Sequence, residues 1–527
     1  MPASPTYPGL YVEEIPSGVH PITGAATADT AFVDYFPRGP VNTPVRTTSF
    51  EDFERTFGGL DAASEGSYAV LQYYLNGGRN AWVVRVDHGD PATATVTLTG
   101  GDGSDDVLVV RASSPGSWGN NLRVAVTETV PDDPDRFNLF VQETRSDAGV
   151  TSVVATESHL GLTMTRTDPG YVVNGVSAAS SLVSVAEADG ADGTRPTLAE
   201  PDAAGNPPES AYADLEDGGE GTAINAAGRL SLTDLGDALE TGWTTLDRID
   251  PFIFNLLCLP ATALLTTAVQ STVIGAAQTY CEAKRAFLLV DTPPVSDVPA
   301  VQTWLTGVGR APSRNAAVYV PRLHISDPLA GGRPRHVGPS GTVAGIYART
   351  DAARGVWKAP AGIEATVRGG SPAAAYNDAD SGALNPQGIN VLRTFAVFGP
   401  VVWGARTLFG ADQRASEWKY VSVRRTALYL ENSLVQGLQW VVFEPNDEPL
   451  WSQIRLNVGA FMQDLFLQQA FQGTTPREAY LVKCDRTTTT QADIDRGVVN
   501  ILVGFAPLKP AEFVIIRIQQ LAGQAQA

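Results

Sequence analysis

The sequence predicts a multi-domain chain of the α/β plus β class, with a central doubly wound α/β sheet domain, an inserted β-rich domain and an α+β C-terminal domain. Its 527 residues are too many for one ordinary core. In one stretch of the chain, apolar and polar residues follow each other with the period of two that is typical of strands. On either side of this stretch, apolar strand-like runs are separated by helix-like segments. Hydrophobic residues make up 43% of the chain and charged residues 18%, so large cores can form.

The N-terminal segment, residues 1–22, is rich in proline and contains the extended piece LYVEEI. Proline disfavours a helix here and favours extended chain. Because no strand follows close enough to pair with it, the segment is either a loosely docked tail or a donor that pairs with the open edge of another sheet.

The central domain is expected from residues 23–92 and 222–387. TAFVDYF reads as a core strand, Ser49 begins a short helix that ends before Gly58, and AWVVRV is a second strand. Further along, the apolar runs FIFNLLCLP, RAFLLVDTP and NAAVYVP alternate with helical segments. This alternation is typical of a sheet whose strands are covered on both faces.

The inserted domain, residues 93–221, contains the period-two strands TATVTL, VLVVRA, LRVAVTE and FNLFVQE. Residues 91–220 hold 6 basic and 21 acidic side chains and so carry most of the net charge of −20. We interpret this as an outward-facing domain whose like charges keep neighbouring copies apart; the alternative is an acidic surface that only aids solubility.

The C-terminal domain, residues 388–510, contains the clearest helix pattern. Asp447 or Asn446 can cap this helix, and Pro449 lies in its first turn. Apolar residues recur at Trp451, Ile454, Val458, Phe461, Met462 and Leu465. The other positions from Trp451 onward include Gln453, Asn457, Gln463, Gln468 and Gln469, and only Arg455 and Asp464 are charged. This face therefore either meets another polypeptide or is an ordinary polar face. The runs VVNILVGFAP and EFVIIRIQQ are strand-like, the second within the terminal segment 511–527.

The composition argues against several classes of function. A net charge of −20 without a basic tract disfavours nucleic acid and anionic membranes as partners. The common catalytic signatures are absent, and the five histidines have no metal-ligand spacing, so we expect neither an enzyme nor a cofactor. Three widely separated cysteines and the lack of a signal-peptide pattern predict a protein that stays in the cytoplasm of the cell that makes it. The uncharged stretch Pro251–Cys281 is interrupted by proline and polar residues, which favours a buried strand and helix over a membrane span.

Several motifs resemble contractile tail sheath proteins, the family that includes phage tail, pyocin and bacterial contractile injection system sheaths. PGLYVEEIPSG, TSFEDFERTFGG and YYLNGGRNAWVVRV resemble the N-terminal part of that family, and SSPGSWGNNLRV resembles its inserted domain. GIYARTDAARGVWKAPAG, WKYVSVRRTALYLENSL, QWVVFEPNDEPLW and TTTTQADIDRGVVNILVGFAPLKPAEFVIIRI resemble its central and C-terminal blocks, in the same order. The resemblance covers about residues 8–518 and is weakest in the loop at about 189–212.

The resemblance implies a structural subunit that polymerises as stacked six-fold rings around an inner tube and contracts to drive the tube through a target envelope. It implies neighbouring sheath subunits, the inner tube protein, and baseplate and cap proteins as partners, without nucleic acid or membrane insertion. It also implies strand-donating arms at both termini. The N-terminal donor strand would be Leu10, Tyr11, Val12, Glu13, Glu14 and Ile15, and the C-terminal sheet or arm would include Phe513, Val514, Ile515, Ile516, Arg517 and Ile518. The helix from Trp451 matches the tube-proximal segment, which makes Arg455, Gln463 and Gln468 candidate inner-tube contacts.

Two other functions are consistent with parts of the sequence. The acidic insert could make the protein a particle-surface binding module for a glycan or a receptor. A hydrolase with an unrecognised site rests only on the size of the chain.

Overall fold

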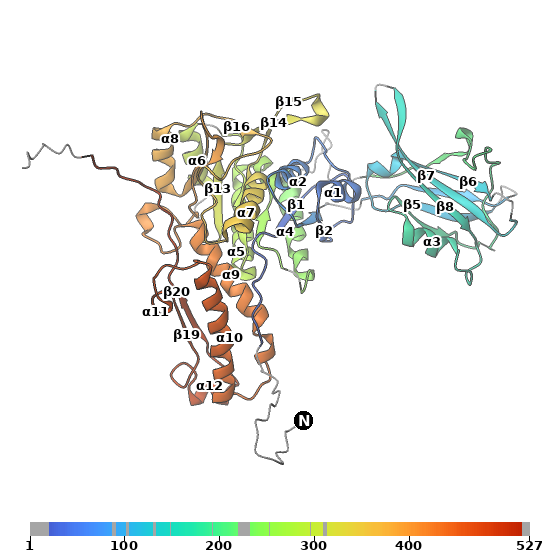
Figure 1. Cartoon of the computed structure of the whole chain (residues 1–527). Helices are drawn as coiled ribbons and strands as arrows, with labels where there is room; N and C mark the ends of the chain where they lie inside the picture. Colours follow the sequence, from blue (N-terminus) through green and yellow to red (C-terminus); the bar gives the residue numbers. More distant parts are fainter. Residues whose placement is uncertain are drawn as a thin grey trace, which may run out of the picture. The chain divides into compact units, whose positions relative to one another are not determined.

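A computed structural model describes residues 20–86, 91–101, 105–129, 133–147, 149–191, 193–219, 232–251, 253–295, 297–308 and 313–518 (Figure 1). The chain divides into two compact units. The first unit comprises Thr350–Pro360 and Glu417–Ala527 with the N-terminal Met1–Thr27. The second comprises Ala28–Arg349 and Ala361–Ser416.

An eight-stranded sheet organises the second unit. In spatial order its strands are β18 (Gly399–Val402), β17 (Ile389–Phe395), β13 (Ala316–Val320), β12 (Phe287–Val290), β11 (Leu256–Cys258), β1 (Thr30–Asp34), β3 (Ala81–Arg85) and β2 (Val45–Thr47). The inner strands are parallel and the two edge strands, β18 and β2, are antiparallel to their neighbours. β1 pairs with β3 on one side and with β11 on the other, so the strand order reverses at β1, as in a doubly wound sheet.

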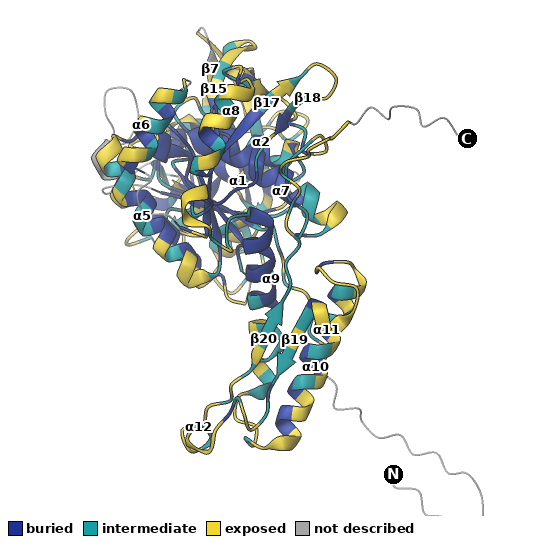
Figure 2. Cartoon of the chain, turned by 90° about the vertical axis from the view of Figure 1, so that its left-hand side faces the viewer, coloured by how far each residue is buried: buried dark blue, intermediate teal, exposed yellow. Residues whose placement is uncertain are grey.

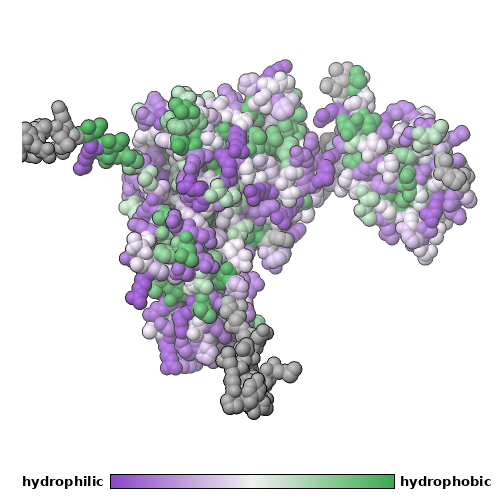
Figure 3. Space-filling view, in the orientation of Figure 1, coloured by the Kyte–Doolittle hydropathy of each residue, from purple (hydrophilic) through white to green (hydrophobic). Residues whose placement is uncertain are grey.

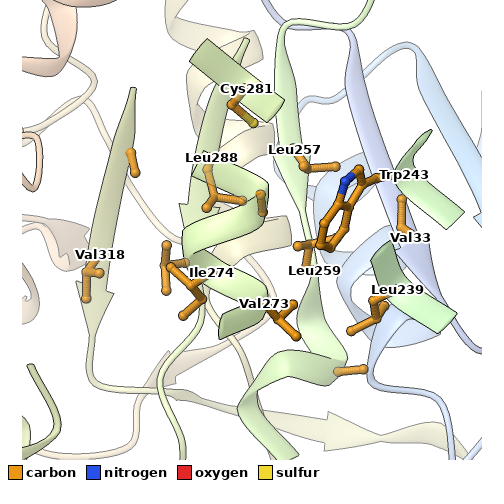
Figure 4. Close-up of a cluster of buried hydrophobic side chains, with 14 of the residues drawn as sticks. Val33, Leu239, Trp243, Leu257, Leu259, Val273, Ile274, Cys281, Leu288 and Val318 are labelled. Atoms are coloured by element: carbon orange, nitrogen blue, oxygen red, sulfur yellow. The ribbon is translucent and has the colours of Figure 1, made fainter. Parts of the chain in front are cut away.

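Helices cover both faces of this sheet, which is why its central strands β12 and β13 are fully buried along their whole length. The described helices around the sheet are α1 (Phe50–Phe57), α2 (Glu65–Leu75), α4 (Leu232–Thr244), α5 (Thr267–Lys284), α6 (Val298–Val308), α7 (Ser340–Arg354) and α8 (Asp378–Leu384); the last residues of α7, from Thr350, belong to the first unit. On one face α4, α5 and α6 form a buried cluster with the strands, in which Trp243 of α4 lies beside Val33, Leu257 and Leu259 (Figure 4). On the other face Phe32 contacts Tyr73 of α2, and Tyr319 is hydrogen-bonded to Tyr347 of α7.

β17 and β18 belong to the eight-stranded sheet, whereas the sequence predicts a C-terminal domain that begins at residue 388. The first unit instead resumes at Glu417. Strand pairing joins segments far apart in the chain, so local sequence does not reveal which sheet a strand enters.

The described part of the insert contains two antiparallel sheets and an α-helix. One sheet has the order β10 (Ala213–Asp214), β6 (Leu122–Glu128), β7 (Phe137–Asp147) and β8 (Val150–Leu162), and the other has the order β4 (Thr95–Thr99), β5 (Asp106–Ala112) and β9 (Val183–Glu187). The helix is α3 (Val172–Ala179). All four strands expected from the alternating pattern are observed. Their inward residues form a separate core.

A small sheet follows β13 in the second unit, with the order β15 (Arg333–Val337), β14 (Leu323–Asp327) and β16 (Ser371–Pro372). The first unit contains the helices α9 (Val421–Gly437), α10 (Glu448–Leu467), α11 (Pro476–Ala479) and α12 (Gln491–Asp495), and the paired strands β19 (Tyr480–Lys483) and β20 (Leu502–Phe505). Asp447 caps α10 by accepting a hydrogen bond from the backbone N–H of Leu450. The apolar stripe predicted for α10 is buried.

The three cysteines are buried and free. Within the described ranges no helix is both long and apolar enough to cross a membrane. The same ranges contain no group of three or more His, Cys, Asp or Glu side chains arranged to hold a metal ion.

Candidate assembly interface

The C-terminal segment is anchored up to Glu512 and exposed beyond it. Pro507 forms a β-bridge with Phe471, and the carboxylate of Glu512 accepts a hydrogen bond from the Tyr420 hydroxyl (3.2 Å). Residues 513–518 form neither helix nor strand. Their five apolar side chains are 73–93% exposed, and this run appears as exposed in Figure 2 and as hydrophobic in Figure 3.

The strand-like run EFVIIRIQQ therefore forms no strand over its described residues in the single chain. The physical reason is that a strand needs a neighbouring edge to satisfy its backbone groups. Among the described residues no strand pairs with 513–518. The segment therefore has side chains that favour a strand but no strand beside it among the described residues.

The first unit also contains a short sheet with unfilled edges. β19 and β20 pair over four residues each, from Tyr480 opposite Phe505 to Lys483 opposite Leu502. Side chains of both strands pack against the core that α10 contributes to. No third strand joins them in the described part of the chain. A two-stranded sheet is only marginally stable by itself, so additional strands would stabilise it.

The root of the N-terminal segment lies along α9. The backbone N–H of Ala25 donates to the Ser433 hydroxyl (2.9 Å), and the His20 ring stacks on Trp440 with ring centroids 4.4 Å apart. Gly437 leaves room for Ile22, since a Cβ there would lie 2.7 Å from the Cγ2 atom of Ile22. The predicted donor strand, Leu10 to Ile15, lies outside the described residues.

A buried ion pair fixes α9 to the segment Thr350–Pro360. Arg425 of α9 pairs with Asp351 at 3.0 and 2.5 Å, and the two side chains are 3% and 4% exposed. The same guanidinium donates to the carbonyl oxygen of Thr27 (2.9 Å). One cation thus joins three separate segments of the first unit.

The candidate inner-tube contacts on α10 do not share one face. Arg455 donates to the carboxylate of Glu448 (2.6 Å) and to the carbonyl oxygen of Cys484, while Gln463 accepts a hydrogen bond from Tyr480 (2.9 Å). Gln468 is exposed at the C-terminal end of the helix. At about 100° per residue, Arg455 and Gln468 lie on nearly opposite sides of α10.

Sequence reasoning missed two exposed leucines on α10. Leu456 and Leu467 are 60% and 68% exposed. They lie eleven positions apart in the sequence, so they project from the same side of the helix, together with Gln463. The sequence does contain a signal for them, because both are large apolar residues outside the predicted buried stripe. This leucine face, Leu456, Gln463 and Leu467, is the apolar outer face of α10.

The carboxyl edge of the large sheet is filled by the chain itself. In doubly wound enzymes ligands bind where the strand order reverses. Here Asp34, at the end of β1, accepts hydrogen bonds from the backbone N–H groups of Tyr35 (2.7 Å) and Ala261 (3.1 Å). Gly66 approaches so closely that a Cβ would lie 2.4 Å from the Asp34 Cβ. Burial raises the pKa of Asp34 to about 8.

A second buried carboxylate lies at the same edge, just after β12. Asp291 accepts hydrogen bonds from the backbone N–H (2.9 Å) and hydroxyl (2.5 Å) of Ser340, and burial raises its pKa to about 6. Perturbed carboxylates often mark catalytic sites, but ion-pair and hydrogen-bond networks also produce them. Both groups here tie loop backbone to the sheet, which is a structural role.

Two family models match the chain. The phage tail sheath protein central domain matches residues 225–408, and the phage tail sheath C-terminal domain matches residues 413–520. The tail sheath protein of Vibrio phage KVP40 is 28% identical over 244 residues, which cover 44% of this chain and 35% of that protein. A putative prophage major tail sheath protein of Pseudomonas aeruginosa is 26% identical over 257 residues, covering 48% of this chain and 62% of that protein. The chain therefore matches about a third of one curated relative and less than two thirds of the other.

Solved sheath structures share the fold at low sequence identity. The contracted sheath complex of PVC, an extracellular contractile injection system, has a TM-score of 0.57 at 20% identity and covers 99% of both chains. The contracted helical sheath of the anti-feeding prophage has a TM-score of 0.56 at 23% identity, covering 98% of this chain and 100% of that chain. A sheath tail protein of Listeria innocua has a TM-score of 0.59 at 14% identity, covering 93% and 96%. Together with the two domain matches, which span more than half of the sequence, these similarities show that the chain belongs to the tail sheath protein family.

Proposed function

We propose that the chain is the structural subunit of a contractile sheath that polymerises as stacked six-fold rings around an inner tube and contracts to drive the tube through a target envelope. The observation that carries this proposal is the apolar C-terminal arm, residues 513–518, which is exposed and pairs with none of the described strands. An exposed apolar run of this kind marks a surface that another polypeptide covers.

If the arm were added as a strand to a sheet of a neighbouring copy, its backbone N–H and C=O groups would gain hydrogen-bond partners. About five ladder hydrogen bonds at about 0.5–1.5 kcal/mol each would contribute on the order of 2–7 kcal/mol per arm. Burial of apolar side chains adds about 1.5–3 kcal/mol for each one fully covered. Ordering the arm and associating two chains offset part of this gain. The sum over many subunits would still hold a polymer together.

The acceptor in this proposal is the β19–β20 sheet of the adjacent subunit, whose edges remain open in the described chain. The N-terminal strand Leu10–Ile15 would complete the same junction. Both arms are hydrogen-bonded to the α9 region where they join the first unit. The Glu512 carboxylate accepts from the hydroxyl of Tyr420, which precedes the helix, and the Ala25 N–H donates to Ser433 within it. One helix would therefore transmit force between two junctions while the extended arms act as flexible links.

The other proposed partners are the inner tube, the baseplate and the cap. The leucine face of α10 is the best candidate for the tube, because Leu456 and Leu467 are large apolar side chains that are 60% and 68% exposed. A solved structure of the anti-feeding prophage baseplate contains a chain of this fold, at 22% identity and a TM-score of 0.55.

Negative-stain microscopy of assembly reactions tests the proposal. The full chain should form tubes with six-fold end views, and deletion of residues 1–18 should leave a folded chain that forms none. A full chain that stays monomeric under all assembly conditions would refute the sheath function. Normal tubes from the deletion variant would refute only the strand-donation mechanism.

A second candidate function uses the insert as a particle-surface binding module. β8 is an edge strand of its sheet, and Val150, Val153 and Val154 on it are 47–70% exposed. An open edge with exposed apolar residues can accept a strand from another protein. Replacing Val153 and Val154 with lysine should abolish binding of assembled particles to target cells without affecting assembly. Unchanged binding would exclude this use of β8.

A further inference from the structure

Two histidines face each other on the β14–β15 hairpin. In the antiparallel register His324 lies directly opposite His336. Their Nε2 atoms are 2.7 Å apart, and the ring centroids are 4.1 Å apart at an interplanar angle of 81°. His336 is exposed and His324 is half-buried, so solvent reaches the pair.

The backbone beneath the pair is held firmly. The hairpin is registered over five residue pairs, from Leu323 opposite Val337 to Asp327 opposite Arg333. Arg322 donates to the carbonyl oxygen of His336 (3.2 Å). Its guanidinium also donates to Glu65 (2.6 Å), and both of these side chains are 7% exposed. The neighbouring positive charge is therefore paired with a buried carboxylate.

We propose that His324 and His336 form a two-imidazole clamp for a divalent transition metal ion of the Zn²⁺, Cu²⁺ or Ni²⁺ class. Imidazole nitrogen is a preferred ligand of these ions, whereas Ca²⁺ and Mg²⁺ prefer oxygen. Each ring would use its Nε2 lone pair and carry its proton on Nδ1. This inference does not depend on the proposed function, because the clamp lies within one chain.

The geometry fits with a small adjustment. Two metal–nitrogen bonds of about 2.0–2.1 Å at a tetrahedral angle place the nitrogens about 3.3 Å apart. The rings therefore need to separate by only about half an ångström from the hydrogen-bonded position, which small side-chain rotations allow while the hairpin stays fixed. Ser371 of β16 lies opposite His324 on the other side of β14, so that side of the pair carries a neutral polar residue.

The described residues supply two ligands and no third His, Cys, Asp or Glu. The remaining coordination positions would be filled by water. The site would thus be open and exchangeable, unlike the closed four-ligand sites that stabilise small folds.

Titration of the purified full chain with Cu²⁺ and Zn²⁺ tests the clamp. Calorimetry should give a stoichiometry of one site, and the electron paramagnetic resonance spectrum of the Cu²⁺ complex should show two nitrogen ligands. His324→Gln and His336→Gln should each weaken binding at least tenfold, because even outer-shell changes reduce metal affinity by about 10–100-fold. His20→Gln, which removes a histidine stacked on Trp440, is the matched control and should bind as the unaltered chain does.

Three results would overturn the clamp: no saturable binding by the unaltered chain, binding that survives both substitutions, or binding lost in only one of them. Circular dichroism of each variant shows whether the chain remains folded. Both substitutions lie on the solvent-facing side of a surface hairpin, and glutamine preserves a polar side chain there, so folding should be retained.

Discussion

The strands of the large sheet and the C-terminal arm are similar in sequence and opposite in environment. β12 (FLLV) and β13 (AAVYV) are fully buried between paired neighbours. Residues 513–518 (FVIIRI) are apolar except for Arg517, and their five apolar side chains are 73–93% exposed. The two regions differ in strand pairing, since the sheet strands pair with neighbours and the arm pairs with no strand in the described part of the chain. An apolar, β-branched run without a partner is therefore a sign of an intermolecular strand.

The largest expected effect is on assembly, through Ile515 in the middle of the arm. Ile515→Pro removes a backbone N–H and cannot occupy the middle of a paired strand. We expect a folded chain that forms no tubes in negative-stain microscopy. Ile515→Val keeps the strand and should assemble normally. Tubes of normal length from the proline variant would show that this segment is not a donated strand.

The second effect concerns the anchoring of α9 by Asp351. Asp351→Ala leaves Arg425 buried without its carboxylate, which should lower the free energy of unfolding of the first unit by about 3–5 kcal/mol. Chemical denaturation followed by tryptophan fluorescence measures this change. Combining Asp351→Leu with Arg425→Met should restore most of the loss, because apolar replacement of a buried pair is often neutral. A loss below about 1 kcal/mol in the single variant would mean that the pair behaves like an exposed one.

The third effect is a pH dependence at the edge of the large sheet. The folded chain keeps a proton on Asp34 up to about pH 8, while the unfolded chain releases it near the ordinary pKa of 3.8. The unfolded state therefore binds fewer protons between these values, and stability falls as the pH rises through this window. The slope from this group reaches at most about 1.4 kcal/mol per pH unit.

Asp34→Asn should reduce the fall in the free energy of unfolding with pH by up to about 1.4 kcal/mol per pH unit between about pH 5 and pH 8. This holds whatever the substitution does to stability at any single pH. Urea unfolding at several pH values measures the free energy of unfolding. Glu51→Gln, at a surface position on α1, is the control and should keep the slope in this range. Identical slopes for the chain and Asp34→Asn would mean that Asp34 is ionised in the folded state.

Patterns with local causes were predictable from the sequence. The caps at Ser49 and Asp447 are confirmed, because a side-chain oxygen at the start of a helix satisfies a free backbone N–H. The buried stripe of α10 is also confirmed, since helical periodicity places its apolar residues on one side. The expected strands TAFVDYF and AWVVRV correspond to β1 and β3.

Features with non-local causes were not predictable. Arg425 and Asp351 are 74 positions apart, and nothing in either neighbourhood marks the other as its partner. His324 and His336 meet only because the hairpin register sets them opposite each other. EFVIIRIQQ has the composition of a strand, yet a strand exists only where another edge receives it. The donor and tube-contact roles assigned to individual residues remain predictions for the same reason.

The smallest effect concerns the root of the N-terminal arm and tests its contrast with the C-terminal arm. Gly437→Ala would place a Cβ 2.7 Å from the Cγ2 atom of Ile22 and should displace that residue at a cost of about 1–3 kcal/mol. Hydrogen exchange of the backbone amides of residues 20 and 22–27 should then accelerate. Gly459→Ala on α10 is the matched control, because nothing lies within 4 Å of its Cβ position. This control should stabilise the helix by about 0.5–1 kcal/mol. If both variants leave exchange unchanged, α9 does not hold the N-terminal root in solution, and the two arms would be equally free before assembly.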